Sequence, residues 1–142
     1  MFANILLPVD LGHDSSWIRA LPAAAELARR DGATLHLLAV APDFGMTAVA
    51  GYFPAGFQQD AVARLNADLA AFAAANGPKD VATKAHVGLG HAAEQILAAA
   101  SATKADLIVM ASHAPDMVRS LLIGSVADRV VHASPVSVLV VR

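Results

Sequence analysis

The C-terminal stretch LIVMASHAPDMVRSLLIGSVADRVVHASPVSVLVVR, residues 107–142, carries the pattern that decides the fold. It begins with the short apolar run LIVM at residues 107–110, as expected of a parallel strand that is covered on both faces. An irregular loop follows, and the pair Gly124-Ser125 opens a segment whose apolar residues recur at helical spacing. The β-branched run at residues 136–141 predicts a final strand. The stretch therefore predicts strand, loop, helix and strand.

The Gly-Ser pair at the start of this helix suggests a ligand. The first amides of a helix have no acceptor within the helix and point out of its end. Beside the carboxyl end of a buried parallel strand, such an end is a natural anion site. The first hypothesis is therefore a phosphate-containing ligand at Gly124 and Ser125. The alternative is a plain helix cap, because serine is a common N-cap residue.

Composition narrows the class of protein. The chain has 142 residues, enough for one domain with a real core, and we predict a single domain over residues 1–142. It is 56% hydrophobic, but no apolar run approaches the ~18 residues that would span a membrane, and the first nine residues do not resemble a signal peptide. The net charge is −2 without a basic run, which argues against nucleic acid. There are no cysteines, which excludes thiol chemistry and fits a reducing cytosol. We expect a cytoplasmic protein that binds neither nucleic acid nor membrane.

Strands and helices alternate along the whole chain. Strands are expected at residues 5–9, 35–40, 81–87, 107–110 and 136–141, the third of them near an edge of the sheet. The first helix is capped by Ser15 or Ser16, or begins nearer Leu21 because Pro22 interrupts it, and it ends at Gly32. Its expected inward residues are Ile18, Leu21, Ala25 and Leu27. After a long loop at residues 42–56, a second helix runs from residue 57 to Asn76, with Phe57, Val62, Leu65, Leu69 and Phe72 inward. A third follows Gly90, with Ile96, Leu97 and Ala100 inward.

This alternation implies an α/β fold with a mostly parallel, doubly wound sheet and helices on both faces. In such sheets the ligand lies beyond the carboxyl ends of the strands, where the strand order reverses. Asp10 follows the first strand, and Ser112 and His113 follow the fourth. If these strands are neighbours, their ends form one cleft.

These residues resemble the universal stress protein family over essentially the whole chain. The segments ILLPVD at residues 5–10 and LHLLAV at 35–40, with the closing stretch, carry the resemblance. The family's nucleotide signature is glycine, two residues, glycine, nine residues, then Gly-Ser or Gly-Thr. The matching positions here are Ala111, Ala114, Gly124 and Ser125, with the spacing intact and both leading glycines replaced by alanine. The loop ASHAPD at residues 111–116 resembles the F-type branch of the family.

The resemblance implies a five-stranded sheet of order 3-2-1-4-5, a dimer, and an adenine-nucleotide site at the ends of strands one and four. Asp10 would meet the adenine or ribose, and Val40 would wall the adenine. The loop after the fourth strand would hold the ribose and phosphates. The candidate ligand-binding residues are Pro8, Val9, Asp10, Val40, Met110, Ala111, Ser112, His113, Ala114, Arg119, Gly124, Ser125 and Val126.

Several of these residues have an alternative explanation. Asp10 could cap the next turn, and His113 could stabilise its own loop rather than serve a phosphate. Arg119 could reach a terminal phosphate or be an ordinary solvated arginine, and Asp116 could help hold Mg²⁺ or lie in an exposed turn. If position 114 needs a positive φ, its alanine reshapes the loop, since only glycine adopts that conformation easily.

The other motifs in the sequence do not predict a further cofactor, metal or catalytic site. The sequence GLGHAA at residues 88–93 matches a relaxed dinucleotide fingerprint, but it follows the third strand and lacks the later acidic residue, so we interpret it as a tight turn. The six histidines show no metal spacing. Ser125 lies in no nucleophile elbow. No metal ligand or catalytic residue is predicted.

The sequence thus favours a cytoplasmic, dimeric stress-response regulator that binds ATP or another adenine nucleotide, with or without Mg²⁺. Residues 136–142 would form an apolar edge strand through which two copies pair. One alternative is a nucleotide-free dimeric interaction module. Another is a slow ATPase or self-phosphorylating enzyme, with Ser125 as the first candidate for modification.

Overall fold

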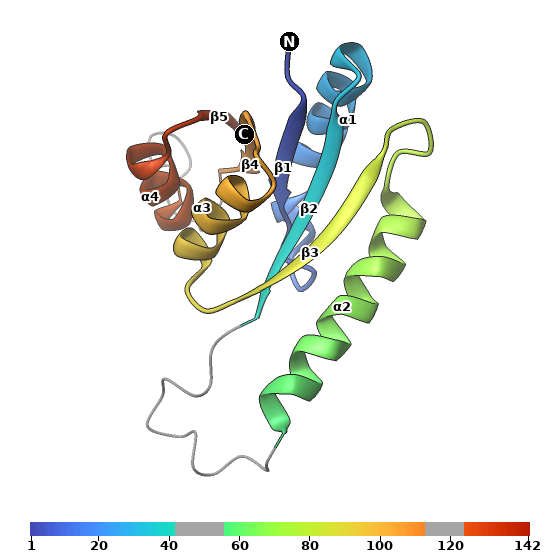
Figure 1. Ribbon diagram of the computed structural model, residues 1–142, viewed down its shortest axis with the longest axis vertical. Helices are drawn as coiled ribbons and strands as arrows, with labels where there is room; N and C mark the ends of the chain where they lie inside the picture. The colour runs from blue at the N-terminus through green and yellow to red at the C-terminus, as the bar shows by residue number, and fades with distance from the viewer. Residues whose placement is uncertain (42–55, 113–123) are drawn as a thin grey trace.

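Parallel strands form the centre of the molecule, and helices cover both faces of the sheet (Figure 1). The computed structural model describes residues 1–41, 56–112 and 124–142. The strands in these ranges are β1 (Asn4–Pro8), β2 (Thr34–Ala41), β3 (Thr83–Leu89), β4 (Leu107–Ala111) and β5 (Ser137–Val141). The helices are α1 (Ala20–Asp31), α2 (Phe57–Asn76), α3 (Ala92–Ala102) and α4 (Ser125–Ala133), with a short 3₁₀ helix η1 (Asp14–Ser16) before α1.

The sheet has the predicted strand order. All neighbouring strands pair in parallel in the order β3-β2-β1-β4-β5. The strand order reverses at β1, because the chain first builds outward to β3 and then crosses to the other side of β1. The carboxyl ends of β1 and β4 therefore lie next to each other, and the predicted α/β fold is confirmed.

Two apolar cores lie on opposite faces of the sheet. Ile5 and Leu7 of β1 point toward α1 and α2, whereas Leu6 between them points toward α3 and α4. Each of the three side chains is 0% exposed. A strand buried on both faces needs apolar residues at every position, which explains the continuous apolar runs in the sequence.

The start of α1 differs from the capping prediction. Ser15 and Ser16 do not cap it, since the helix begins at Ala20 after the N-cap residue Arg19. The alternative start near Leu21 is confirmed. Ile18 precedes the helix and is 53% exposed, so its predicted inward position is wrong. The helix ends as predicted at Gly32, whose φ of +68° is the left-handed conformation that favours glycine.

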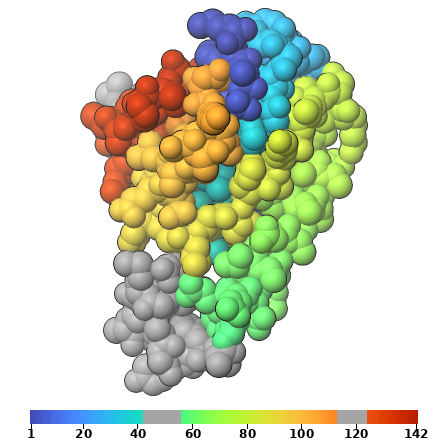
Figure 2. Space-filling view, viewed as in Figure 1, coloured from blue at the N-terminus to red at the C-terminus, as the bar shows by residue number. Residues whose placement is uncertain are grey.

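Helix α2 packs more loosely than its sequence predicts. Leu69 is its buried residue, while Leu65 and Phe72 contact the same core from half-buried positions. Figure 2 shows α2 along one side of the molecule, with its outer surface open to solvent. Except for Gly56, the predicted loop at residues 42–56 lies outside the described residues.

The two edges of the sheet are β3, as predicted, and β5. On α4, next to β5, the buried face consists of Ala127 and Val130. Val126 and Val131 are 37% and 40% exposed, so this helix has more apolar residues at helical spacing than it buries. Within the described ranges, no helix combines the length and apolar character that crossing a membrane requires.

Candidate functional site

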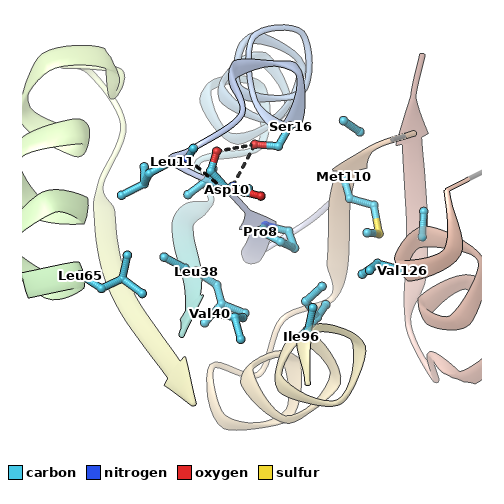
Figure 3. A pocket seen from close by; sticks show the side chains of 16 residues that line it. Pro8, Asp10, Leu11, Ser16, Leu38, Val40, Leu65, Ile96, Met110 and Val126 are labelled. Atoms are coloured by element: carbon cyan, nitrogen blue, oxygen red, sulfur yellow. Dashed lines mark hydrogen bonds between the residues drawn. The ribbon is translucent and has the colours of Figure 1, made fainter. Parts of the chain in front are cut away.

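A cavity of about 330 Å³ opens at the carboxyl ends of β1, β2 and β4 (Figure 3). Its volume is at the small end of the range of ligand pockets, about 300–1,000 Å³. The position is the one predicted for a doubly wound sheet, where the strand order reverses. The lining residues come from seven regions. They are Pro8, Val9, Asp10, Leu11 and Gly12 around the end of β1, Ser16 of η1, Leu38, Ala39 and Val40 of β2, Leu65 of α2, Ala92 and Ile96 of α3, Met110 and Ala111 of β4, and Val126 and Ala127 of α4.

The walls of the cavity are mostly apolar, and its polar side chains lie together at one end. Val40 and Ile96 lie close together below Pro8, and Asp10 and Ser16 lie on the opposite side (Figure 3). A flat apolar group fits between such walls, and a group with hydrogen-bond donors fits the carboxylate. Among the residues that the structure describes, none of those lining the cavity is a lysine or an arginine.

Asp10 is held by the turn that follows it. The Gly12 amide donates to Oδ1 at 2.9 Å, and Nδ1 of His13 lies 3.0 Å from Oδ2. The Asp10 side chain is nonetheless 60% exposed. An ionised carboxylate has about four acceptor positions, so two such contacts leave room for a ligand's donors.

Ser16 closes this turn through its hydroxyl group. The hydroxyl oxygen accepts the Asp10 amide at 2.9 Å, and it lies within donating distance of the carbonyl oxygens of Asp10 and His13, at 3.0 and 2.8 Å. Since a hydroxyl has one hydrogen, it donates to one of these carbonyls at a time. Ser16 therefore fixes the backbone that carries Asp10 and does not start α1.

The end of β4 accommodates the alanine that replaces the first signature glycine. Ala111 is the last residue of β4 and pairs with Val141, so its backbone is extended. Among the described residues other than glycine, positive φ is confined to Lys104. The next amide, of Ser112, donates to the Val141 carbonyl at 2.9 Å. Alanine at 111 thus costs no backbone strain.

Helix α4 begins at the predicted pair. Gly124 is the N-cap residue, is buried, and has a φ of −55°, a conformation open to any residue. Ser125 is the first helical residue and is exposed. The backbone conformation at Gly124 therefore does not by itself require glycine.

The structure brings most of the predicted site residues together. Those that line the cavity are Pro8, Val9, Asp10, Val40, Met110, Ala111 and Val126. Ser112 and Ser125 adjoin lining residues in the chain without lining the cavity themselves, and Gly124 precedes Ser125. His113, Ala114 and Arg119, like Asp116, lie outside the described residues.

Sequence reasoning missed the walls supplied by helices. Leu65 of α2 and Ala92 and Ile96 of α3 line the cavity, although only burial was expected of Leu65 and Ile96. A signal existed for Leu38, because it lies two residues before Val40 and so on the same face of β2. No local signal marks the helical residues, since their place depends on how each helix crosses the sheet.

Gly90 forms the turn between β3 and α3 that was interpreted from the sequence, whereas Gly88 lies within β3. Gly90 has a φ of +134°, and its amide donates to the Ala41 carbonyl at 2.9 Å. The Gln95 side chain packs over this turn, and a Cβ on Gly88 would lie 2.9 Å from its Oε1. In the parts of the chain that the structure describes, no three potential metal-ligating side chains gather.

Comparison with known proteins gives the family. The model of the universal stress protein family matches residues 1–142, and the chain belongs to this family. Among solved structures, the chain is similar to the universal stress protein UspA from Lactobacillus plantarum, with 25% identity, 99% of this chain and 97% of that chain covered, and a TM-score of 0.75.

Two further structures of the family contain nucleotides. One is a universal stress protein in complex with cAMP, at 23% identity, with 99% and 97% of the two chains covered and a TM-score of 0.68. The other is the universal stress protein from Archaeoglobus fulgidus in complex with dAMP, at 19% identity, with 100% and 98% covered and a TM-score of 0.62. At these identities the likeness shows a common fold.

Proposed function

We propose that the chain binds an adenine nucleotide in the cavity at the ends of β1, β2 and β4, and that it acts as a dimeric regulator in a stress response. The observation that carries the proposal is the cavity itself, in which apolar walls end in one carboxylate. The family membership and the cAMP and dAMP held by two relatives support an adenine nucleotide.

The chemistry of Asp10 favours one orientation of the ligand. A carboxylate only accepts hydrogen bonds, so Asp10 pairs with the adenine amino group or the ribose hydroxyls and repels phosphate. The base or sugar therefore lies at the end of β1, between Leu38, Val40 and Ile96.

The phosphates then lie toward α4. The first amides of that helix, from Ser125 on, have no acceptor within it, and the helix dipole favours an anion there by about 0.3–1 kcal/mol. Arg119 and the other candidates outside the described residues would add to this site. Its proposed ligand is ATP, with or without Mg²⁺.

Calorimetric titration with ATP and Mg²⁺, after carried-over nucleotide has been removed, tests the proposal. We expect about one ATP per chain, with cAMP and AMP competing for the same site. Ala111→Leu fills the cavity from the end of β4 and should abolish binding. Ala85→Leu, on an exposed position of β3 away from the cavity, is the matched control and should bind normally.

Absence of heat, together with no competition against a fluorescent ATP analogue, would overturn the nucleotide proposal. The alternative function, a nucleotide-free dimeric interaction module, would then be favoured. One observation supports that alternative: among the described lining residues none carries a positive charge. Phosphate release that Ser125→Ala abolishes would instead indicate a slow ATPase or self-phosphorylating enzyme.

The proposal includes a dimer formed through residues 136–142. The edge strand β5 is partly exposed along its length, and an unpaired apolar edge invites pairing with a second copy. We further propose that the protein acts in the cytoplasm and belongs to the F-type branch, whose loop Ala111 and Ser112 begin. Sedimentation showing only monomer at micromolar concentration would contradict the dimer.

A further inference from the structure

A chain of hydrogen-bonding side chains crosses three strands away from the cavity. Nδ1 of His36 on β2 lies 2.9 Å from Nε2 of His86 on β3, and Nε2 of His36 lies 3.1 Å from Oδ1 of Asn4 on β1. Asn4 Nδ2 donates to the Lys104 carbonyl oxygen at 3.4 Å. His36 is 5% exposed and is the one polar residue that is buried as a whole among the described residues. We call Asn4, His36 and His86 the imidazole chain.

The direction of every hydrogen bond in the imidazole chain follows from its Lys104 end. A backbone carbonyl only accepts, so the Asn4 atom that faces Lys104 is the amide nitrogen and the atom that faces His36 is the oxygen. His36 must therefore carry its hydrogen on Nε2, which leaves Nδ1 as an acceptor. His86 then donates to it from Nε2.

This arrangement holds only while His36 is neutral. Protonation of His36 at Nδ1 requires Nε2 of His86 to give up its hydrogen and accept instead, and once both rings are protonated two N–H groups face each other at 2.9 Å, so the contact between β2 and β3 is lost. The rings are stacked with centroids 5.1 Å apart, which brings a new charge close to the other ring. A buried charge without a partner is costly.

The surroundings of His36 and His86 also favour the neutral form of each ring. Burial lowers the pKa of His36, and His86 and Lys84 lower it further; burial and then Lys84 lower the pKa of His86. Lys84 pairs in register with His36 across the β2–β3 ladder. Helix α3 packs on the same face of the sheet, and its one charged side chain, Glu94, lies on an exposed position of its first turn. The nearby carboxylate of Asp106 accepts the amides of Ala3 and Asn4. Neither histidine forms an ion pair with a carboxylate in the ranges that the structure describes.

We propose that the imidazole chain is an acid-sensitive device, in which protonation of both His36 and His86 breaks the contact between them and loosens the β2–β3 edge of the sheet. Because the folded protein binds these protons less readily than the unfolded chain, the stabilisation is complete above the unfolded pKa of about 6.5 and is lost as pH falls below it. Strand β2 also carries Leu38 and Val40 into the cavity, and Leu38 pairs with His86. The loosening therefore reaches the ligand site; this last step rests on the proposed function.

Urea unfolding between pH 8 and pH 5 tests the device. One proton taken up on unfolding raises the unfolding equilibrium constant about tenfold per pH unit. We expect wild type to show up to this much more acid sensitivity than His36→Leu, which removes the titrating ring. His86→Gln removes the second titrating ring and offers an amide that can donate to or accept from His36, so it should also be less acid-sensitive than wild type. His91→Gln alters an exposed histidine that is not part of the imidazole chain and should behave as wild type.

Nuclear magnetic resonance of the wild type gives a second test that does not depend on the folding of variants. At pH 7.5 the ¹⁵N shifts of His36 should report the Nε2–H tautomer, and below pH 6 the protection of amides, relative to their intrinsic exchange rates at each pH, should fall in β3 before it does in β4. An Nδ1–H tautomer, or a His36→Leu protein as acid-sensitive as wild type, would overturn the proposal. If ATP does not bind at any pH, the proposed function fails. The His36 tautomer and the acid sensitivity of His36→Leu still test the acid-sensitive device in that case.

Discussion

Nδ1 of His13 lies 3.0 Å from Oδ2 of Asp10, so the carboxylate at the mouth of the cavity is oriented by a side chain three residues along the chain. The Gly12 amide holds the other oxygen, and Ser16 fixes the backbone between them. The candidate ligand acceptor is therefore positioned by its own turn and needs no help from the opposite side of the sheet.

Replacement of this carboxylate should weaken nucleotide binding. Asp10→Asn leaves the size unchanged but places an amide where Gly12 and His13 donate. A hydrogen bond to a charged group contributes about 1.5–3 kcal/mol, so we expect the ATP affinity to fall at least about tenfold. Calorimetry measures it, with Asp14→Asn on the exposed η1 as the control. An affinity equal to that of wild type would place the ligand elsewhere.

Leu69 anchors α2 to the sheet. It is 0% exposed and is the buried residue of that helix. Leu69→Ala should lower the free energy of unfolding by about 2–5 kcal/mol, as expected for a leucine lost from a core. Ile18→Ala removes a 53% exposed apolar side chain and should change it by no more than about 0.5 kcal/mol. Denaturant unfolding compares the two; similar losses would mean that α2 contributes little to the core.

Asp31 should govern part of the acid stability. Its carboxylate pairs with Arg30 at 2.8 Å and accepts the Phe2 amide at 3.0 Å. The Arg30 guanidinium and then the Phe2 amide hold the pKa of this carboxyl well below its usual range. Its stabilisation is therefore present above the unfolded pKa of about 4 and is lost as pH falls below it.

We expect Asp31→Asn to destabilise the protein at pH 7 and to differ less and less from wild type as pH falls below 4. Thermal unfolding from pH 7 to pH 2 measures this difference, and Asp60→Asn on the exposed face of α2 is the control. A difference that stays constant over this range would show that the Asp31 charge does not matter.

A charge on the edge strand should separate the proposed dimer. Leu139 of β5 is 38% exposed, and lysine on an edge strand discourages pairing. We expect Leu139→Lys to sediment as a monomer at a concentration at which wild type is a dimer. Ile18→Lys, at an exposed apolar position away from β5, should leave the dimer intact. If Leu139→Lys remains dimeric, the interface lies elsewhere.

The sequence was sufficient to predict the sheet. The run at residues 107–110 and the apolar segments before Asp10 and after His36 are continuous because their strands are buried on both faces. The order of strands followed from a family resemblance rather than from the pattern alone. The end of β1 beside the end of β4 then placed Asp10 near Ala111 and Met110.

Other features depend on contacts that a local pattern does not contain. Ser16 has the chemistry of a helix cap, but it is used to close the Asp10 turn instead. Leu65 and Ile96 meet in one cavity only because α2 and α3 both begin near the carboxyl edge of the sheet. The contact between His36 and His86 joins residues 50 positions apart and depends on the register of β2 against β3.

The central position of β1 has a consequence for synthesis. The amides of Ala3 and Asn4 donate to the carboxylate of Asp106, more than 100 residues later, and β1 pairs on that side with β4. On a ribosome, β1 can therefore pair with β2 early, whereas its other edge waits for most of the chain to emerge. During that interval the half-built sheet exposes an apolar edge at Ile5 and Leu6, and this nascent form, rather than the finished protein, is where a chaperone would be needed.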